Sequence, residues 1–404
     1  MPSAAGPIAS AKQNLVFNYD TGDKGNSFIG EPTTNLINPN APNIYTWWSR
    51  STQTITQLSE TYKGNPIYRV SISIDDGDML YHINARWGAG SGWYMPSTTY
   101  YANTPYVASV IYRPVSHADT RVYGHPSNIS GWGLTVDDSI DLDGGWKQHR
   151  IDRNYGTTVG DNRFHHMHTP SATIGQTVII DITSSQIEAK AHATPFVNGT
   201  RSATQGLLPL IGNSSIDLTN MSFDANAQIT YDGTNDYASV TLPSSLNVYC
   251  LEMVWYNNNA IPNNDTVIGG PSTYQTPIEF NGNATGVHLG AWTSGLTNEA
   301  IHIWAGGGAT ANRVYVGAGY HHVVFNWNGI TYDIWVDGVN TTTYYASGTV
   351  PAALITATSI KLGNDVNGYC FNGQIPVTKI YDSSLTSNDI INNYKQYKPR
   401  FNLS

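Results

Sequence analysis

Short apolar runs alternate with clusters of glycine, asparagine, aspartate and proline along most of the chain. This pattern is typical of β-strands joined by turns. The clearest predicted strands are residues 66–74, 106–115, 177–183, 248–256 and 321–328. Helical periodicity is nearly absent before residue 386. The sequence therefore predicts an all-β protein.

Two tight turns lie in the stretch HHVVFNWNGITYDIWVDGVNTTTY, residues 321–344. Asn328-Gly329 and Asp337-Gly338 each supply residues that tolerate the positive φ angles of a two-residue hairpin turn. Three strands joined by two such turns form a meander. This segment carries the strongest structural signal in the chain.

A helix is predicted only at the end, in LTSNDIINNYKQYKP, residues 385–399. Thr386 and Asp389 have the spacing of a capping box, and Pro399 is expected to end the helix. One face of this helix, expected to lie on a sheet, is formed by Ile390, Ile391, Tyr394 and Tyr397.

Two extended stretches interrupt the strand pattern, at residues 31–43 and 191–215. The stretch 191–215 is rich in proline, glycine and threonine, and 31–43 is similar in character, so we interpret both as crossings between modules. Because they flank the first β-rich block, they indicate a block attached at both ends rather than a simple tandem.

Composition narrows the class of protein. A chain of 404 residues suits two or three domains. Its charged fraction of 12 % is about half of the typical ~25 %, whereas 11 Trp and 26 Tyr supply material for cores. The net charge of -9, with Lys and Arg scattered singly, disfavours a nucleic-acid binder.

The number of cysteines, the length of the apolar runs and the first ten residues indicate the cellular compartment. Cys250 and Cys370 form no disulfide framework; two buried free thiols are expected, and whether they meet stays open. No apolar run approaches ~18 residues, so no membrane insertion is predicted. The first ten residues lack the pattern of a signal peptide, so we expect synthesis in a cytosol.

Residues 228–401 resemble the laminin-G-like (concanavalin A-like) jelly-roll domains of tailed-phage structural proteins. The resemblance is carried by AQITYDGTNDYASV (227–240), HHVVFNWNGITYDIWVDGV (321–339), IKLGND (360–365) and NGQIPVTKIYDSSLTSNDIINNYKQYKPRF (372–401). The last segment is similar to the closing pattern of that family, in which a strand, a Tyr-containing turn and a capped helix follow one another.

The same resemblance implies an insertion. The family's opening strand is similar to LVFNYDTGDKGN at 15–26, and the turn that normally follows it is similar to residues 207–223. An independently folding block costs little when it is placed in a loop. The predicted organisation is an N-terminal arm at 1–13, a discontinuous jelly roll of 14–30 plus 201–404, and an insert at 31–200.

The insert resembles carbohydrate-binding-module-like β-sandwiches, which also occur in phage virion proteins. The matching segments are PTTNLI (32–37), GWKQHRI (145–151), TVIIDITSSQIEA (177–189) and TPFVNGTRS (194–202). The predicted fold class is therefore all-β, with two β-sandwich/jelly-roll modules, one inserted in the other, and a short C-terminal helix.

Catalytic carboxylates are sparse. Jelly rolls of this shape include glycoside hydrolases, which need two carboxylates flanking the sugar bond. The resemblance implies that these lie two to four residues apart on one strand, and no glutamate here has an aspartate two residues away: Glu31, Glu60, Glu188, Glu252, Glu279 and Glu299. We predict no enzymatic activity, unless two aspartates from distant loops act as the pair.

Sugar binding is the site hypothesis. Aromatic side chains stack on the apolar faces of pyranose rings, and amides and carboxylates bond the hydroxyls. The candidate glycan-binding residues lie in the segments WWSR and RWGAGSGWYMP, and are Trp47, Trp48, Trp87, Trp93 and Tyr94. The alternative is that these rings fill the sandwich core or a subunit contact.

Metal ligands are weakly indicated. Asp-rich turns at 74–79 and 135–145 do not match the EF-hand pattern, so no metal or cofactor is predicted, with a structural Ca²⁺ as the alternative. In RFHHMHTP, His166 and His168 share a strand face, where three copies around a threefold axis could bind an octahedral metal. We interpret this as a hydrogen-bonded or exposed histidine pair.

These observations and the resemblance together predict a non-enzymatic virion structural protein of a tailed phage. It would decorate the capsid, form a head or tail fibre, or act as an adhesin. Its expected partners are other virion proteins, cell-surface glycans and further copies of itself. The alternatives are a bacterial glycan-binding or glycan-hydrolysing protein with a concanavalin A-like domain, and a cement protein without a ligand.

Overall fold

The structure is a computed structural model that describes residues 14–36, 53–74, 80–83, 104–124, 139–154, 165–258, 275–282, 285–289, 301–304, 309–312, 316–329, 331–345 and 355–403. The chain forms two compact units. Unit 1 comprises Met1–Pro32 and Ser202–Ser404, and unit 2 comprises Thr33–Arg201.

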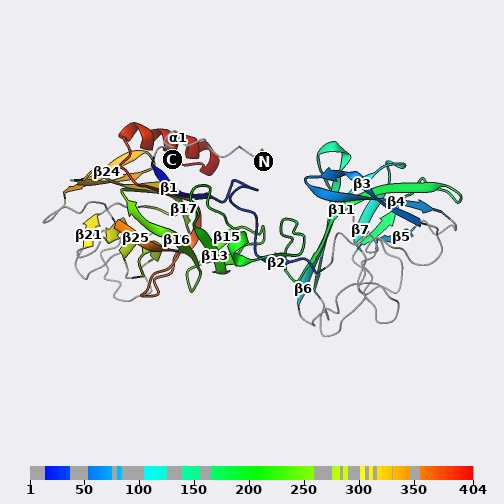
Figure 1. Cartoon of the computed structure of the whole chain (residues 1–404), viewed down its shortest axis with the longest axis horizontal. Coiled ribbons are helices and arrows are strands. Elements are labelled where there is room, and N and C mark those ends of the chain that lie inside the picture. Colours follow the sequence, from blue (N-terminus) through cyan, green and yellow to red (C-terminus); the bar gives the residue numbers. More distant parts are fainter. Residues whose placement is uncertain are drawn as a thin grey trace. The chain divides into compact units, whose positions relative to one another are not determined.

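Unit 1 contains an eight-stranded sheet, here called sheet I (Figure 1). Its order is β14 (Ser222–Phe223), β15 (Ile229–Asp232), β26 (Asn372–Tyr381), β17 (Cys250–Asn257), β22 (Gly319–Trp327), β23 (Thr331–Val336) and β24 (Val339–Tyr345), and β1 (Leu15–Asp20) also pairs with β26. The predicted meander is confirmed, since β22, β23 and β24 are neighbours and Gly329, Asp337 and Gly338 have positive φ.

A second sheet of unit 1, sheet II, lies beneath the first (Figure 1). Its order is β13 (Ser215–Asn220), β16 (Tyr237–Val248), β25 (Ile355–Leu362), β18 (Gln275–Phe280), β19 (Thr285–Leu289), β20 (Ile301–Trp304) and β21 (Ala309–Asn312). Strand residues alternate between faces, so Trp255 and Phe325 of sheet I meet Val240 and Ile360 of sheet II in one buried core.

The first strand, β1, belongs to this sandwich. It pairs antiparallel with β26, with Tyr19 opposite Thr378 and Asp20 opposite Val377. Since Thr378 also pairs with Met253 of β17, β1 and β17 occupy opposite edges of β26. Phe17 and Tyr19 are buried in the core, so the strand opens the jelly roll although its sheet partners lie far along the chain.

The chain returns beside β1 after the insert. Asn18 forms a bridge with Ile211 and Phe28 forms one with Leu207. The Ser27 hydroxyl donates to the Leu208 carbonyl oxygen at 2.8 Å. The opening strand and the segment at 207–223 are thus neighbours in space, as the resemblance implies.

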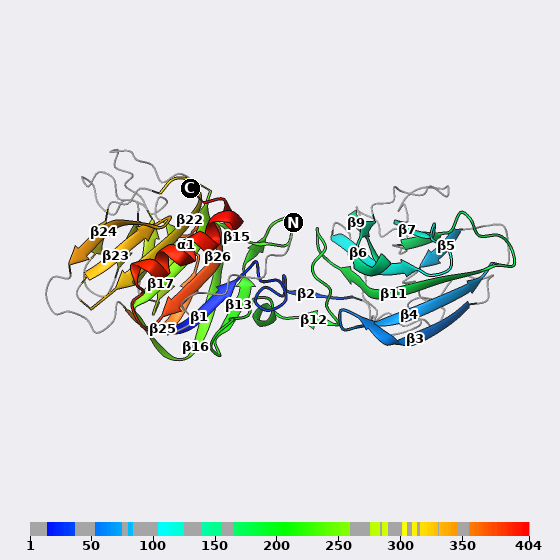
Figure 2. The same ribbon diagram turned by 90° about the horizontal axis from the view of Figure 1, so that it is seen from above.

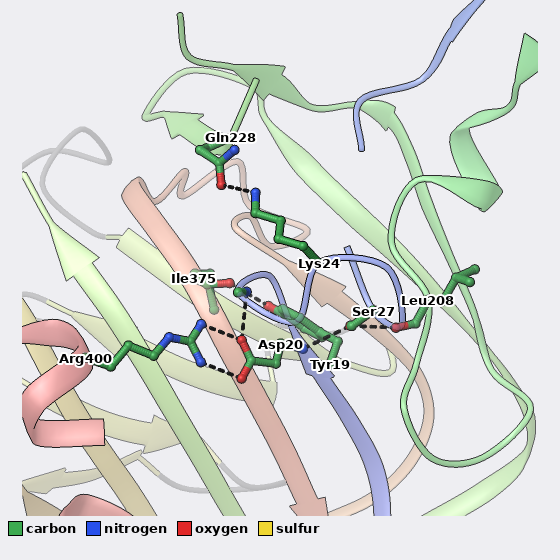
Figure 3. Close-up of polar contacts among 9 residues, drawn as sticks. Tyr19, Asp20, Lys24, Ser27, Leu208, Gln228, Ile375 and Arg400 are labelled. Carbon is green, nitrogen blue, oxygen red and sulfur yellow. Dashed lines mark hydrogen bonds and ion pairs between the residues drawn. The ribbon is translucent and has the colours of Figure 1, made fainter. Parts of the chain in front are cut away.

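An ion pair fixes the end of β1 to the end of the chain (Figure 3). Arg400 donates to both carboxylate oxygens of Asp20, from Nη1 at 2.6 Å and from Nη2 at 2.5 Å. Beside it the Tyr19 hydroxyl donates to the Ile375 carbonyl oxygen at 3.0 Å. Asp20 is largely buried, so this contact joins β1, β26 and the C-terminal helix.

That helix, α1 (Ser387–Phe401), lies across β22, β17 and β26 on the outward face of sheet I (Figure 2). The predicted capping box is present, with Thr386 and Asp389 bonded reciprocally. The prediction that Pro399 ends the helix is wrong. A proline near the C-terminus costs few helical bonds, and the helix ends at Asn402, which has left-handed φ and donates its N–H to the Lys398 carbonyl oxygen.

Unit 2 contains a six-stranded sheet, sheet III, and a three-stranded sheet, sheet IV. Sheet III has the order β3 (Gln53–Tyr62), β4 (Asn65–Ser73), β11 (Thr177–Glu188), β6 (Pro105–Pro114), β9 (Lys147–Asn154) and β8 (Ile140–Asp141). Sheet IV has the order β5 (Leu80–Ile83), β10 (His165–His168) and β7 (Arg121–Gly124). The core of unit 2 includes Val70, Tyr112, Val122 and Ile180.

Unit 2 begins and ends at one place. The short strands β2 (Thr33–Thr34) and β12 (Thr200–Arg201) pair with each other. Below them the fully buried Glu188 carboxylate accepts from Thr33 Oγ1 at 2.7 Å and from Thr194 Oγ1 at 2.6 Å. The motifs PTTNLI and TPFVNGTRS therefore meet around one buried carboxylate.

The fold class predicted from the sequence is confirmed. The described residues form several sheets and one α-helix, which lies near the C-terminus. No helix among the described residues is long and apolar enough to span a membrane. Cys250 and Cys370 are both buried free thiols.

We predict that Asp20→Ala lowers the free energy of unfolding of unit 1 by about 2 kcal/mol, because it leaves the guanidinium of Arg400 without its carboxylate. Hydrogen–deuterium exchange of the full chain checks this, with faster exchange expected in β1 and β26. Asp382→Ala, at an exposed position just after β26, is the matched control and should leave exchange unchanged. Equal acceleration in both variants would contradict the prediction.

Candidate functional site

The aromatic residues predicted to bind glycans lie outside the described residues. They are Trp47, Trp48, Trp87, Trp93 and Tyr94. Their role stays a prediction, and the described aromatic side chains are the ones from which a site can be built.

One group of aromatic residues lies on the outward face of sheet I, beyond the end of α1. Strand alternation directs Val254 and Tyr256 of β17 away from the core, while Trp255 between them is buried in it. Tyr256 stands opposite Tyr320 of β22 and opposite Gln374 of β26. Three neighbouring strands thus present two phenols and one amide in a single row.

The last turn of α1 completes this group. The ring of Phe401 lies 5.1 Å from that of Tyr320, which in turn lies 4.9 Å from that of Tyr256, measured between centroids. The Tyr320 hydroxyl donates to Gln374 Oε1 at 2.9 Å. All four side chains are half-buried. We call Tyr256, Tyr320, Gln374 and Phe401 the helix-end patch.

The four side chains of the helix-end patch carry no charge. Arg400 lies over the Phe401 ring, 4.5 Å from its centroid, but its charge is compensated by Asp20. Nearby, Lys24 donates to Gln228 Oε1 at 2.7 Å (Figure 3). Half-buried, uncharged rings beside an amide suit the apolar face and hydroxyls of a neutral sugar.

Glu252, which the sequence places alone on a strand, is sealed beneath α1 and has no exposed surface. It accepts from His322 Nε2 at 3.0 Å and from the Tyr381 hydroxyl at 2.7 Å. Burial alone raises the pKa of Glu252, but the Lys379 ammonium and these hydrogen bonds outweigh it and hold the pKa at about 2. The carboxylate is an internal polar group, out of reach of a polysaccharide.

The other described glutamates also lack the arrangement of a catalytic pair. Glu188 is buried against Thr33 and Thr194, close to the paired strands β2 and β12 of unit 2. Glu279 has 1 % of its surface exposed, accepts from the Val366 amide at 3.0 Å and lies 3.7 Å from Lys361 Nζ. Glu31 is buried, and Glu60 is exposed on β3.

In unit 2, three charged side chains cross the outward face of sheet III. Asp181 of β11 stands between Arg69 of β4 and Arg113 of β6 in the strand register. Arg69 Nε reaches Asp181 Oδ1 at 2.8 Å, and Arg113 Nη2 reaches Oδ2 at 2.6 Å. Burial by itself raises the pKa of Asp181, but hydrogen bonds from the two guanidinium groups outweigh it and lower the pKa.

Aromatic rings extend this row. The Arg113 guanidinium lies 4.7 Å from the centroid of the Trp146 ring, and Trp146 lies 4.6 Å from Tyr62. Because these neighbours leave Trp146 only 4 % exposed, the ring contributes to packing rather than to a sugar platform.

The metal hypotheses gain no support from the geometry. His166 and His168 lie on β10, the central strand of sheet IV, opposite His82 and Leu80 of β5. Of the Asp-rich turns, residues 75–79 and 135–138 lie outside the described residues. Within the described part of the chain, no three His, Cys, Asp or Glu side chains form a group that could hold a metal ion.

Sequence comparison identifies part of unit 1. Residues 232–391 match the family model described as the concanavalin A-like lectin/glucanases superfamily. This segment is a concanavalin A-like jelly-roll domain, and it contains all of the helix-end patch except Phe401. No curated protein matches the chain.

Solved structures resemble the chain only distantly. Domain 4 of AbnA, a GH43 extracellular arabinanase from Geobacillus stearothermophilus, in complex with arabinotriose, has 15 % identity over 45 % of this chain and 81 % of that domain, with a TM-score of 0.30. The botulinum neurotoxin serotype D binding domain has 11 % identity over 48 % of this chain and 49 % of that one, with a TM-score of 0.35. The sialidase of Trypanosoma rangeli has 11 % identity over 86 % of this chain and 62 % of that one, with a TM-score of 0.32.

The chain spans about half the length of the toxin binding domain. At these identities and TM-scores the similarities carry no inference about what this chain binds.

Sequence reasoning missed the helix-end patch. The alternation in VYCLEMVWY does place Tyr256 on the same face as Glu252, which was a usable signal. The strand pattern did not show where α1 ends. The helix covers Glu252 but stops before Tyr256.

We predict that Asp181→Asn destabilises unit 2 by about 2 kcal/mol at neutral pH, because two guanidinium groups lose their shared carboxylate. The pKa of this carboxyl is lowered on folding, so its contribution is present above the unfolded value of 3.8 and is lost as the pH falls through the folded value. Calorimetry of the full chain at pH 7 and pH 3 should show the variant approaching the wild type in acid.

Asp152→Asn is the matched control, since Asp152 forms an exposed pair with Arg150 at 3.8 Å and such pairs contribute little. A constant difference between wild type and Asp181→Asn at both pH values would contradict the assignment of a charged Asp181.

Proposed function

We propose that this protein binds glycans without cleaving them, through its concanavalin A-like jelly roll. The observation that carries the proposal is the helix-end patch, in which the partly exposed rings of Tyr256, Tyr320 and Phe401 lie beside Gln374. Rings of this kind stack on the apolar face of a sugar, and the amide bonds its hydroxyls.

The placement of the glutamates supports binding without hydrolysis. Glycoside hydrolysis needs two carboxyl groups on either side of the scissile bond. Glu252 and Glu279, the glutamates on described strands of unit 1, lie on different sheets and are both buried. Neither can reach a sugar from its present position.

We further propose that the protein is a structural component of a tailed-phage virion, as capsid decoration, fibre or adhesin. The support is the resemblance of residues 372–401 and of the opening strand to such proteins. Unit 2, which resembles carbohydrate-binding modules, would then be a second binding or contact module. Other virion proteins and further copies of this chain are the proposed partners.

We predict that Tyr256→Ala and Tyr320→Ala each weaken glycan binding about tenfold, as loss of a central aromatic contact does. Glycan-array screening of the full chain, followed by titration of the best ligand, measures this. Because the side chains of the helix-end patch are uncharged, affinity should be the same at low and high salt. Tyr237→Ala, a half-buried tyrosine on sheet II, is the matched control.

Two outcomes would contradict this proposal. One is a ligand whose affinity is unchanged by both tyrosine substitutions, which would move binding elsewhere in the chain. The other is release of reducing sugar from the bound glycan, with turnover abolished by a single carboxylate substitution, which would make the protein a hydrolase.

The virion proposal predicts that the chain copurifies with infectious particles at a fixed ratio to the major capsid protein. Mass spectrometry and immunogold labelling of gradient-purified particles test this. Labelled particles are expected, and absence of the protein from them would remove the virion role while leaving the glycan-binding proposal in place.

A further inference from the structure

A lysine, an asparagine and a glutamate meet between sheet I and α1. Glu252 and Lys379 stand directly opposite each other on β17 and β26, and Asn393 descends on them from the middle of α1. Their exposed fractions are 0 %, 3 % and 1 %. Burial of ionic groups costs free energy, so this cluster is a costly feature of the fold.

One carboxylate oxygen faces both nitrogens. Glu252 Oε2 accepts from Asn393 Nδ2 at 2.9 Å and lies 3.7 Å from Lys379 Nζ. The latter distance is an ion-pair contact, longer than a hydrogen bond, so the amine is held near the carboxylate without being fixed to it.

Besides His322, whose Nε2 lies 3.0 Å from Glu252 Oε1, the environment is aromatic and apolar. Lys379 Nζ lies 4.9 Å from the centroid of the Tyr397 ring, and Val254 and Val377 pack against the same tyrosine. The Tyr381 hydroxyl donates to Glu252 Oε2 and lies 3.3 Å from Asn393 Nδ2. An amine, an amide and a base are thus enclosed together with little access for water, which favours reaction between them.

We infer that Lys379 and Asn393 become joined by an intramolecular isopeptide bond, with Glu252 transferring the protons. A proton passes from Nζ to the Glu252 carboxylate, and the neutral Nζ attacks Cγ of Asn393. The Nζ–Cγ bond forms, Glu252 gives its proton to Nδ2, and the Cγ–Nδ2 bond breaks so that Nδ2 leaves as ammonia. Nζ then gives its second proton through Glu252 to that ammonia, which becomes ammonium.

The balance closes without an oxidant or a cofactor. One lysine ammonium and one asparagine amide give one secondary amide and one ammonium ion, and the Glu252 carboxylate is regenerated. The hydrogen bond from Nδ2 to Oε2 places the leaving nitrogen against the group that protonates it. The product fastens the middle of α1 covalently to β26, so the helix could no longer peel away from sheet I.

The test is the intact mass of the purified full-length protein under denaturing conditions. The wild type should be lighter than its sequence by one ammonia, and tandem mass spectrometry of a digest should find one branched peptide joining Lys379 to Asn393. Glu252→Ala, Lys379→Arg and Asn393→Ala should each restore the unmodified mass. Asn392→Ala, at the exposed neighbouring position, is the matched control and should keep the loss.

The wild-type measurement decides the matter even if a variant fails to fold. An unmodified mass in the folded wild type would overturn the inference. So would an ammonia loss that the digest locates at an Asn-Gly sequence such as Asn328-Gly329, because succinimide formation there causes the same loss. The result is independent of glycan binding, because these three residues are buried and do not reach a bound glycan.

Discussion

The pairing of β1 with β26 is the constraint on which the rest of unit 1 depends. It brings a strand from the start of the chain against the last strand of the sheet, with Tyr19 opposite Thr378. Phe17 and Tyr19 fill part of the core, so sheet I cannot be completed without them. The ion pair between Asp20 and Arg400 then fixes this strand to the helix that covers the sheet.

This constraint also explains how an inserted unit is tolerated. The chain leaves β1, and on its return residues 207–211 run beside 18–28. Unit 1 itself therefore holds together the two points at which the chain leaves for the insert and returns from it. Unit 2 meets this requirement from its own side, because β2 and β12 pair and Glu188 binds threonines from both ends. The motifs PTTNLI and TPFVNGTRS, which suggest no chemistry when seen only in the sequence, thus meet around one buried carboxylate.

The outward face of sheet I is divided by the length of α1. Under the helix lie Glu252, Lys379 and Asn393, where the exclusion of water favours proton transfer and the proposed amide exchange. Beyond its last turn lie Tyr256 and Tyr320, where the same face meets solvent and suits a sugar ring. One face of one sheet therefore carries both a candidate covalent link and a candidate binding site, and the end of the helix separates them.

The all-β class, the meander at 321–344 and the capped terminal helix follow from the sequence alone, because strand alternation, turn glycines and capping boxes act over a few residues. It also indicated the strand 15–20 as part of a distant sheet, through resemblance. It gave the wrong end for the helix and no sign of Asn393 or of the helix-end patch. Those depend on which strands become neighbours and on where α1 stops, and contacts between residues more than fifty positions apart are decided only when the chain packs.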